Sequence, residues 1–283
     1  MRVNLFQDKT LFPNSKLVYR TGGNEIIKAP LSEGLDIPKH SDRQSYWKNN
    51  INDNIDILIT NSGYTEQRLM EVGINREILR KCVGGVSTSF IKTSNFNRNE
   101  NTKRVFLCAS RFVHYKNHDI LIDVFNELRN RKYDFTLNLV GDGLLLDSIK
   151  EKVKQFGLEN YIVFKGVFSN QQVLDELLRS DYYIQLSSEY ETKVSGGSYL
   201  HSEGMGRSII EAISCGTFVI SSFSGAIPEV INDNTGALVH IENRQEIIET
   251  IEKLLLSMPK PNGFTDKYSW GNYFKLYEEI FSE

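Results

Sequence analysis

Apolar runs of strand length alternate with amphipathic stretches of helical spacing over most of the chain. The strand-like runs lie at 104–110, 135–141, 160–166, 181–188, 217–222 and 236–240. The helical stretches lie at 117–131, 144–157, 170–180, 206–214 and 243–257, with a short helix at 227–232. Strands that alternate with helices build a parallel sheet that is covered on both faces. The pattern therefore predicts a Rossmann-like α/β domain of about six strands.

The first third of the chain carries this alternation more sparsely. Strands are expected at 16–20 and 55–61, a helix at 63–73, and a strand at 77–85 that ends in a Gly-Gly turn. The further segments that the pattern singles out are a polar, asparagine-rich interdomain linker at 87–103 and an aromatic amphipathic helix at 268–281. The aromatic rings of this helix are expected to pack across a domain seam.

The composition narrows the classes of function. The 283 residues suffice for two domains, and the proportions of hydrophobic (40%) and charged (24%) residues are typical of a globular protein. A net charge of −3 provides no basic surface, so no nucleic-acid partner is predicted. Cys82, Cys108 and Cys215 form no C-x-x-C pair and are expected to be core residues in a reducing compartment.

Neither a secretory leader nor a membrane span is expected. The first residues lack a continuous apolar region, and no run approaches the ~18 apolar residues that a span needs. We therefore expect a cytoplasmic protein. Membrane contact should be at most peripheral, and the sequence contains no basic amphipathic helix that would argue for such contact.

Two cations follow the first strand of the predicted sheet. Arg111 and Lys116 lie just before the helix that is expected near Asn117. Such sheets bind ligands beyond the carboxyl ends of their strands. A helix start disfavours cations, and a bound phosphate would explain the cations and the helix start together. We interpret the pair as a phosphate site, with two solvated surface charges as the alternative.

The segment EGMGRSIIE at 203–211 adds glycines and two carboxylates. Gly204 and Gly206 allow backbone N–H groups to approach a ligand at a helix start, which with the two cations predicts a diphosphate site. Glu211 lies among apolar residues, where an unpartnered carboxylate is costly, so a vicinal diol such as a ribose is its expected partner. Glu203 would lie on the other side of the phosphates; an acid favoured by the helix dipole explains it equally well.

Three histidines lie near the same edge. His114, His118 and His201 lack the further ligands that a metal site needs. We interpret them as polar lining or surface residues, and no metal site is predicted.

EGMGRSIIE resembles the Glu-x7-Glu motif of family 4 retaining glycosyltransferases, whose GT-B fold has two facing Rossmann-like domains. SRFVHYKNHDILIDVF and EAISCGTFVISSFSGAIPEVI resemble further blocks of that family, and the likeness extends from about Ile55 to the end. It implies an α/β GT-B fold with a complete C-terminal Rossmann-like domain and a partial N-terminal one. The implied divisions are an acceptor-side domain with linker at 1–94, a nucleotide-sugar-binding domain at 95–268, and a helix crossing back at 269–283.

The resemblance also implies roles for the candidate residues. The implied donor-binding set is Arg111, Lys116, Glu203, Gly204, Met205, Gly206 and Glu211, of which Arg111, Lys116 and Glu203 would be catalytic. Arg111 and Lys116 would hold the donor diphosphate, Glu203 the sugar, and Glu211 the ribose. No cofactor or metal is expected, because the cations and the helix dipole would neutralise the leaving diphosphate. The sugar would pass with retention to a glycan, lipid-linked or other hydroxyl acceptor, in glycan or polysaccharide biosynthesis.

Two features depart from the family. The inserted stretch TKVSGGSYLHS at 192–202 is expected to be a Gly/Ser-rich loop that overhangs the donor site as a lid or a specificity element. The N-terminal half is short, and Arg20 and Thr21 stand where His or Asp is frequent in the family. Such a half-domain leaves apolar sheet edges uncovered, so a homo-oligomer or a partner subunit is expected.

Three functions stay open on the sequence. The first is a hexosyltransferase that uses a nucleotide-sugar donor. The second is a non-catalytic nucleotide-sugar-binding subunit that needs a partner chain for the acceptor half. The third is an interaction scaffold, which the retention of all four charged candidates disfavours.

Overall fold

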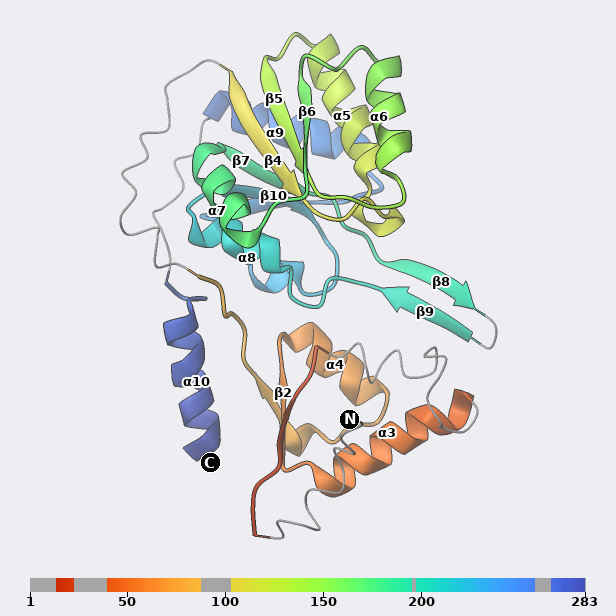
Figure 1. Ribbon diagram of the computed structural model, residues 1–283, viewed down its shortest axis with the longest axis vertical. Helices are drawn as coiled ribbons and strands as arrows, with labels where there is room; N and C mark the ends of the chain where they lie inside the picture. Colours follow the sequence, from red (N-terminus) through yellow and green to blue (C-terminus); the bar gives the residue numbers. More distant parts are fainter. Residues whose placement is uncertain (1–13, 23–39, 88–102, 195–196, 258–265, 283) are drawn as a thin grey trace.

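The computed structural model describes residues 14–22, 40–87, 103–194, 197–257 and 266–282. They form a six-stranded parallel sheet flanked by helices, a three-stranded parallel sheet and an antiparallel hairpin (Figure 1). The predicted α/β class with parallel sheets is confirmed. The predicted linker lies almost wholly outside the described residues. Within these ranges we find no helix with the length and apolar content that a membrane crossing requires.

The large sheet is built from the segments that the sequence predicts. Its strands are β4 (Arg104–Ala109), β5 (Phe135–Val140), β6 (Ile162–Gly166), β7 (Tyr182–Gln185), β10 (Phe218–Ser222) and β11 (Gly236–Val239). Their order is β11-β10-β7-β4-β5-β6, and all neighbours are parallel. The chain leaves β4 toward β6 and then returns to the other side of β4. A switch point therefore lies between β4 and β7, where such sheets form their ligand crevice.

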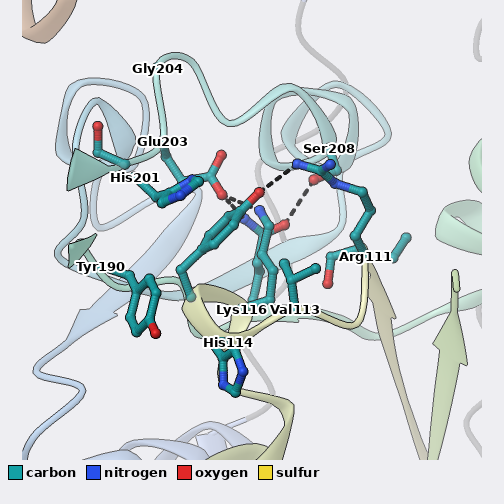
Figure 2. A pocket seen from close by; sticks show the side chains of 14 residues that line it. Arg111, Val113, His114, Lys116, Tyr190, His201, Glu203, Gly204 and Ser208 are labelled. Atoms are coloured by element: carbon teal, nitrogen blue, oxygen red, sulfur yellow. Dashed lines mark hydrogen bonds and ion pairs between the residues drawn. The ribbon is translucent and has the colours of Figure 1, made fainter. Parts of the chain in front are cut away.

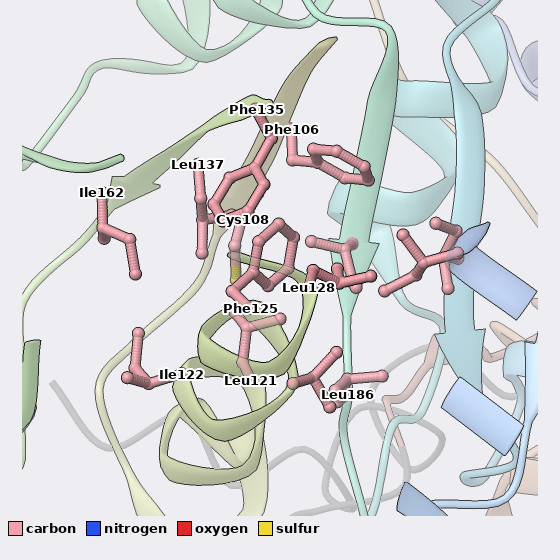
Figure 3. Close-up of a cluster of buried hydrophobic side chains, with 14 of the residues drawn as sticks. Phe106, Cys108, Leu121, Ile122, Phe125, Leu128, Phe135, Leu137, Ile162 and Leu186 are labelled. Atoms are coloured by element: carbon pink, nitrogen blue, oxygen red, sulfur yellow. The ribbon is translucent and has the colours of Figure 1, made fainter. Parts of the chain in front are cut away.

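Helices cover both faces of this sheet, because each presents one apolar stripe to it. One face carries α5 (His118–Asn130), α6 (Leu146–Gln155) and α9 (Arg244–Ser257). The other carries α7 (Asn170–Arg179) and α8 (Arg207–Ser214). On the first face the Phe106 ring lies edge-on to Phe125 with a centroid separation of 5.0 Å (Figure 3). The next residue, Leu107, points into the opposite core, as the two-residue period of a strand requires.

The small sheet has the order β1-β2-β3, and all its pairs are parallel. Its elements are β1 (Val18–Arg20), α3 (His40–Asn54), β2 (Ile57–Thr60), α4 (Gly63–Glu71), η2 (Arg76–Ile78) and β3 (Leu79–Lys81). Leu58 packs with Leu69 of α4 and Ile51 of α3 in one cluster. Ile59, on the opposite side of β2, packs with Tyr273 of α10 (Trp270–Ser282). Helix α10 thus follows the strands of the large sheet in the chain but packs against the small sheet (Figure 1).

The stretch 192–202 differs from the expectation. It belongs to a hairpin of β8 (Tyr190–Val194) and β9 (Gly197–His201), in which Val194 pairs with Gly197. The expectation of a loop is therefore wrong, because the backbone groups of β8 and β9 satisfy one another in an antiparallel ladder. Figure 1 shows the hairpin extending away from the large sheet on the side of α3 and α4.

Candidate functional site

The loop after β4 brings both predicted cations to one crevice. The 3-10 helix η4 (His114–Lys116) leads into α5 through Asn117, whose φ of 50° asparagine tolerates better than most residues. Arg111 is exposed and donates from Nη2 to the Tyr115 hydroxyl over 2.5 Å. Lys116 is largely buried, with 11% of its side chain exposed. Arg111 and Lys116 therefore line the same crevice, Arg111 from an exposed position and Lys116 from a largely buried one.

Lys116 forms an ion pair with Glu203, which joins the loop after β4 to the segment before α8 (Figure 2). Glu203 Oε1 also accepts hydrogen bonds from Gln185 Nε2 at 3.3 Å and from Ser187 Oγ at 3.0 Å. The Glu203 side chain is 14% exposed, so the charge depends on these partners for compensation. Among the described residues Oε2 accepts no hydrogen bond, which leaves this oxygen for a ligand.

The turn between Glu203 and α8 is held close to the backbone that follows β10. A Cβ on Gly225 would lie 2.2 Å from the carbonyl oxygen of Glu203, and the Ala226 amide donates to that oxygen over 2.7 Å. Gly206 precedes α8 with a φ of 66°, which favours glycine. The first N–H groups of α8 lack partners within the helix and carry its positive end, so an anion is favoured beside them.

Glu211 lies in α8 with 5% of its surface exposed. Its Oε1 accepts a hydrogen bond from Asn170 Nδ2 at 2.8 Å, and Arg207 Nε lies 3.4 Å from the same oxygen. Burial raises the pKa of the Glu211 carboxyl, although the Asn170 bond and the Arg207 charge oppose the effect. The carboxylate is therefore costly to keep ionised, and titratable groups perturbed in this way are concentrated at functional sites.

Two cavities meet at the cations. The first, of about 600 Å³, reaches the base of the hairpin and is called the hairpin cavity; Tyr190, His201 and Gly204 line it. The second, of about 820 Å³, contains Glu211 and is called the Glu211 cavity. The side chains common to both are Ala109, Ser110, Arg111, Lys116, Glu203 and Ser208. The two cations thus lie at the junction, with one carboxylate there and the other in the Glu211 cavity.

The donor-binding candidates that line the two cavities are Arg111, Lys116, Glu203, Gly204 and Glu211. Met205 and Gly206 line neither cavity, and Met205 packs against the core cluster that contains α8. Sequence reasoning missed Gln185 and Ser187, which hold Glu203, and Asn170, which holds Glu211. For Gln185 and Ser187, the available signal was the presence of polar residues at the end of the buried strand YYIQLSS.

The histidines divide into two kinds. His114 and His201 line the hairpin cavity. His118 does not fit the expectation of a lining or surface residue, because it is 1% exposed and its ring stacks on Phe112 at 4.1 Å. Its Nε2 lies 3.2 Å from Ser110 Oγ. The helical position of His118 turns it toward the core, which a lone histidine in the sequence does not reveal.

The burial of His118 leads us to expect that the free energy of unfolding depends on pH. Burial, with a smaller effect of the Lys116 charge, lowers the pKa of His118 from 6.5 to about 4. Between these values the unfolded chain binds a proton that the folded chain does not. Stability fully present above pH 6.5 should therefore be lost toward pH 4, by about 3 kcal/mol. Urea unfolding at pH 7 and pH 4.5 measures the loss; an undiminished loss in His118→Phe, which keeps a ring on Phe112, would assign it to other groups.

Comparison with known proteins finds a matching family model and several relatives. The family model described as "Glycosyl transferases group 1" matches residues 90–267. Protein CapJ of Staphylococcus aureus is 32% identical over 141 residues, which cover 48% of this chain and 32% of CapJ. The GDP-mannose-dependent alpha-(1-6)-phosphatidylinositol monomannoside mannosyltransferase of Mycolicibacterium smegmatis is 30% identical over 152 residues, covering 53% of this chain and 38% of that enzyme. The matches thus span about a third of these relatives' lengths.

Solved structures share the fold. Anabaena HepE in complex with UDP superposes with a TM-score of 0.76 at 20% identity, over 98% of this chain and 76% of that one. Sucrose-phosphate synthase of Thermosynechococcus elongatus superposes with a TM-score of 0.69 at 18% identity, over 98% and 71%. These likenesses confirm the predicted GT-B type of α/β fold.

Proposed function

Because the chain belongs to the glycosyl transferases group 1 family, we propose that it is a retaining hexosyltransferase of the family 4 type, with EGMGRSIIE as its Glu-x7-Glu motif. It moves a sugar from a nucleoside diphosphate donor to a hydroxyl acceptor in glycan or polysaccharide biosynthesis. One observation carries the proposal: two cations and the start of α8 converge where two cavities meet, with one carboxylate at the junction and another in the second cavity.

The diphosphate lies at the junction. Arg111 and Lys116 supply positive charge, and the free N–H groups at the start of α8 supply donors of fixed direction. This charge neutralises the diphosphate as it leaves, so no metal ion is needed for that role. The acceptor oxygen attacks the anomeric carbon from the face that the phosphate leaves. The bond between the anomeric carbon and the oxygen of the leaving diphosphate breaks, and the acceptor proton passes to that oxygen.

The two carboxylates bind opposite ends of the donor. Glu211 accepts hydrogen bonds from the ribose hydroxyls within its cavity, where Val140 and Phe168 provide apolar surface for the base. Glu203 accepts from a hydroxyl of the sugar through Oε2, since Oε1 is occupied by Lys116, Gln185 and Ser187. UDP is bound in the HepE structures and GDP-mannose is the donor named for the mycobacterial relatives, so both nucleotides are candidates.

The small sheet forms the acceptor side. Its residues approach the donor turn: Asn61 Nδ2 lies 3.6 Å from where a Cβ of Gly204 would stand. Glu229, in η5 (Ile227–Glu229), accepts from the Gly63 amide at 2.9 Å and the Tyr64 amide at 2.6 Å. The proposed division has an acceptor domain at 1–94, a donor domain at 95–268 and a returning helix at 269–283, because the small and large sheets share no strand.

Nucleotide titration tests the proposal. Arg111→Gln removes one charge-assisted contact from an exposed side chain and should weaken UDP or GDP about 10-fold in calorimetry. Lys154→Gln, on the exposed surface of α6, is the matched control and should leave the affinity unchanged. Equal affinity of wild type and Arg111→Gln, or no nucleotide binding by either, contradicts the diphosphate site. Nucleotide binding without donor hydrolysis or transfer would instead favour the non-catalytic subunit.

A further inference from the structure

Four aromatic rings gather where the hairpin leaves the large sheet. Tyr190 begins β8 and His201 ends β9, and the two residues are partners in the ladder. The Tyr190 ring stacks on His114 with a centroid separation of 5.8 Å and an interplanar angle of 15°. The His201 ring stacks on Tyr115 at 5.1 Å and 14°. The ring centroids of Tyr190 and His201 lie 6.2 Å apart, so the two stacks join into one group. We call these four rings, of His114, Tyr115, Tyr190 and His201, the ring wall.

The ring wall faces a cavity rather than a core. None of its members belongs to a hydrophobic core cluster of the described residues. All four line the hairpin cavity, and Tyr190 is 41% exposed. Figure 2 shows His201 next to Glu203, and Tyr190 near His114 lower in the view. Aromatic surface left open to a cavity is costly in water unless a ligand covers it.

The chemistry of the cavity suits a pyranose ring. Such a ring has an apolar C–H face and a rim of hydroxyls, so it needs a flat apolar surface on one side and polar groups around it. The ring wall supplies the flat surface, and Tyr and His edges add polar atoms. Ser202 supplies a hydroxyl nearby in the same cavity. The apolar and polar parts are thus held by different elements of one site.

We propose that the ring wall is a subsite for the acceptor sugar, which makes the inserted hairpin a determinant of acceptor specificity. This inference rests on the proposed donor site. His114, Tyr190 and His201 line the hairpin cavity but not the Glu211 cavity. In the order nucleoside, diphosphate, donor sugar, acceptor, they therefore lie on the acceptor side of Glu203. Glu189, next to Tyr190, accepts from the Tyr64 hydroxyl at 2.7 Å, which brings the acceptor side of the chain to the same point.

Glycoside binding to single variants tests the subsite. The probes are methyl glucoside, mannoside and galactoside, observed by saturation-transfer NMR without nucleotide and again with saturating UDP or GDP. Wild type and Tyr190→Phe, which keeps the ring, should bind at least one of them. Tyr190→Ala should bind it roughly 5-fold more weakly, because one aromatic contact is lost. Phe274→Ala, a stacked and exposed ring of α10 outside the cavity, is the control and should bind as wild type does.

Calorimetry separates the acceptor from the donor sugar. If the inference holds, Tyr190→Ala binds nucleotide and nucleotide sugar as wild type does, while its KM for the glycoside in transfer rises about 5-fold. A selective loss of nucleotide-sugar affinity would assign the ring wall to the donor sugar and overturn the inference. Equal glycoside binding by Tyr190→Ala and Tyr190→Phe, or no binding of the probes by wild type, would also overturn it. Glycoside binding that depends on Tyr190 in a protein without nucleotide affinity would uphold the ring wall and refute the proposed donor site.

Discussion

Replacing Lys116 with methionine should lower the free energy of unfolding by about 3–5 kcal/mol, because Glu203 is then left charged and largely buried without its counter-ion. Glu203→Gln should be costly for the mirror-image reason, since it leaves the largely buried ammonium of Lys116 without a counter-charge. The double variant should lose less than the sum of the two, because neither charge then remains. Urea unfolding followed by circular dichroism at pH 7 measures all three.

An exposed pair provides the control for this cycle. Lys150 and Asp147 lie 3.9 Å apart on α6 with side chains 50% and 100% exposed. Lys150→Met should cost less than about 1 kcal/mol, because water already solvates both charges. A Lys116→Met cost as small as that of Lys150→Met would mean that the Lys116–Glu203 pair is not removed from water. Additive effects in the double variant would mean that the two side chains do not depend on each other.

Glu211→Gln should weaken nucleotide and nucleotide sugar alike, by roughly 10- to 100-fold, through the loss of charge-assisted bonds to the ribose. Its stability should not fall, because burial raises the pKa of Glu211 and thus opposes the ionised form that glutamine removes. Glutamine also keeps an oxygen for Asn170, which now donates to Glu211 Oε1. Calorimetry with UDP and GDP, beside urea unfolding at pH 7, measures both effects.

Glu203→Gln is the matched comparison for the two carboxylates. It should leave nucleotide affinity nearly unchanged and reduce donor turnover, because Glu203 meets the sugar and not the nucleoside. The opposite pattern would exchange the two assignments. Loss of folding in Glu211→Gln would instead make Glu211 a structural residue of α8.

The large sheet could be predicted because its signals are local. A strand such as FTLNLV and a helix such as HDILIDVFNELRN each carry their own apolar period, and both form within a few residues of the expected bounds. Helix α3 carries no such signal, because HSDRQSYWKNNINDN is mostly polar; among its described side chains, Ile51 packs into the core of the small sheet. The hairpin was missed for a related reason: its Gly, Ser and Thr residues read as a loop, and backbone pairing creates the strands.

By itself the sequence determined that four charged residues stand next to helix starts at the carboxyl edge of a parallel sheet. Arg111 and Lys116 follow one strand, Glu203 and Glu211 bracket a glycine turn, and both segments precede helices at a carboxyl edge. Only the tertiary structure decided how these groups pair. Lys116 meets Glu203, 87 positions away, and the ring wall joins η4 to the hairpin. Such pairings depend on β4 lying next to β7 in the sheet, and that neighbourhood is set by long-range packing, which a local period does not encode.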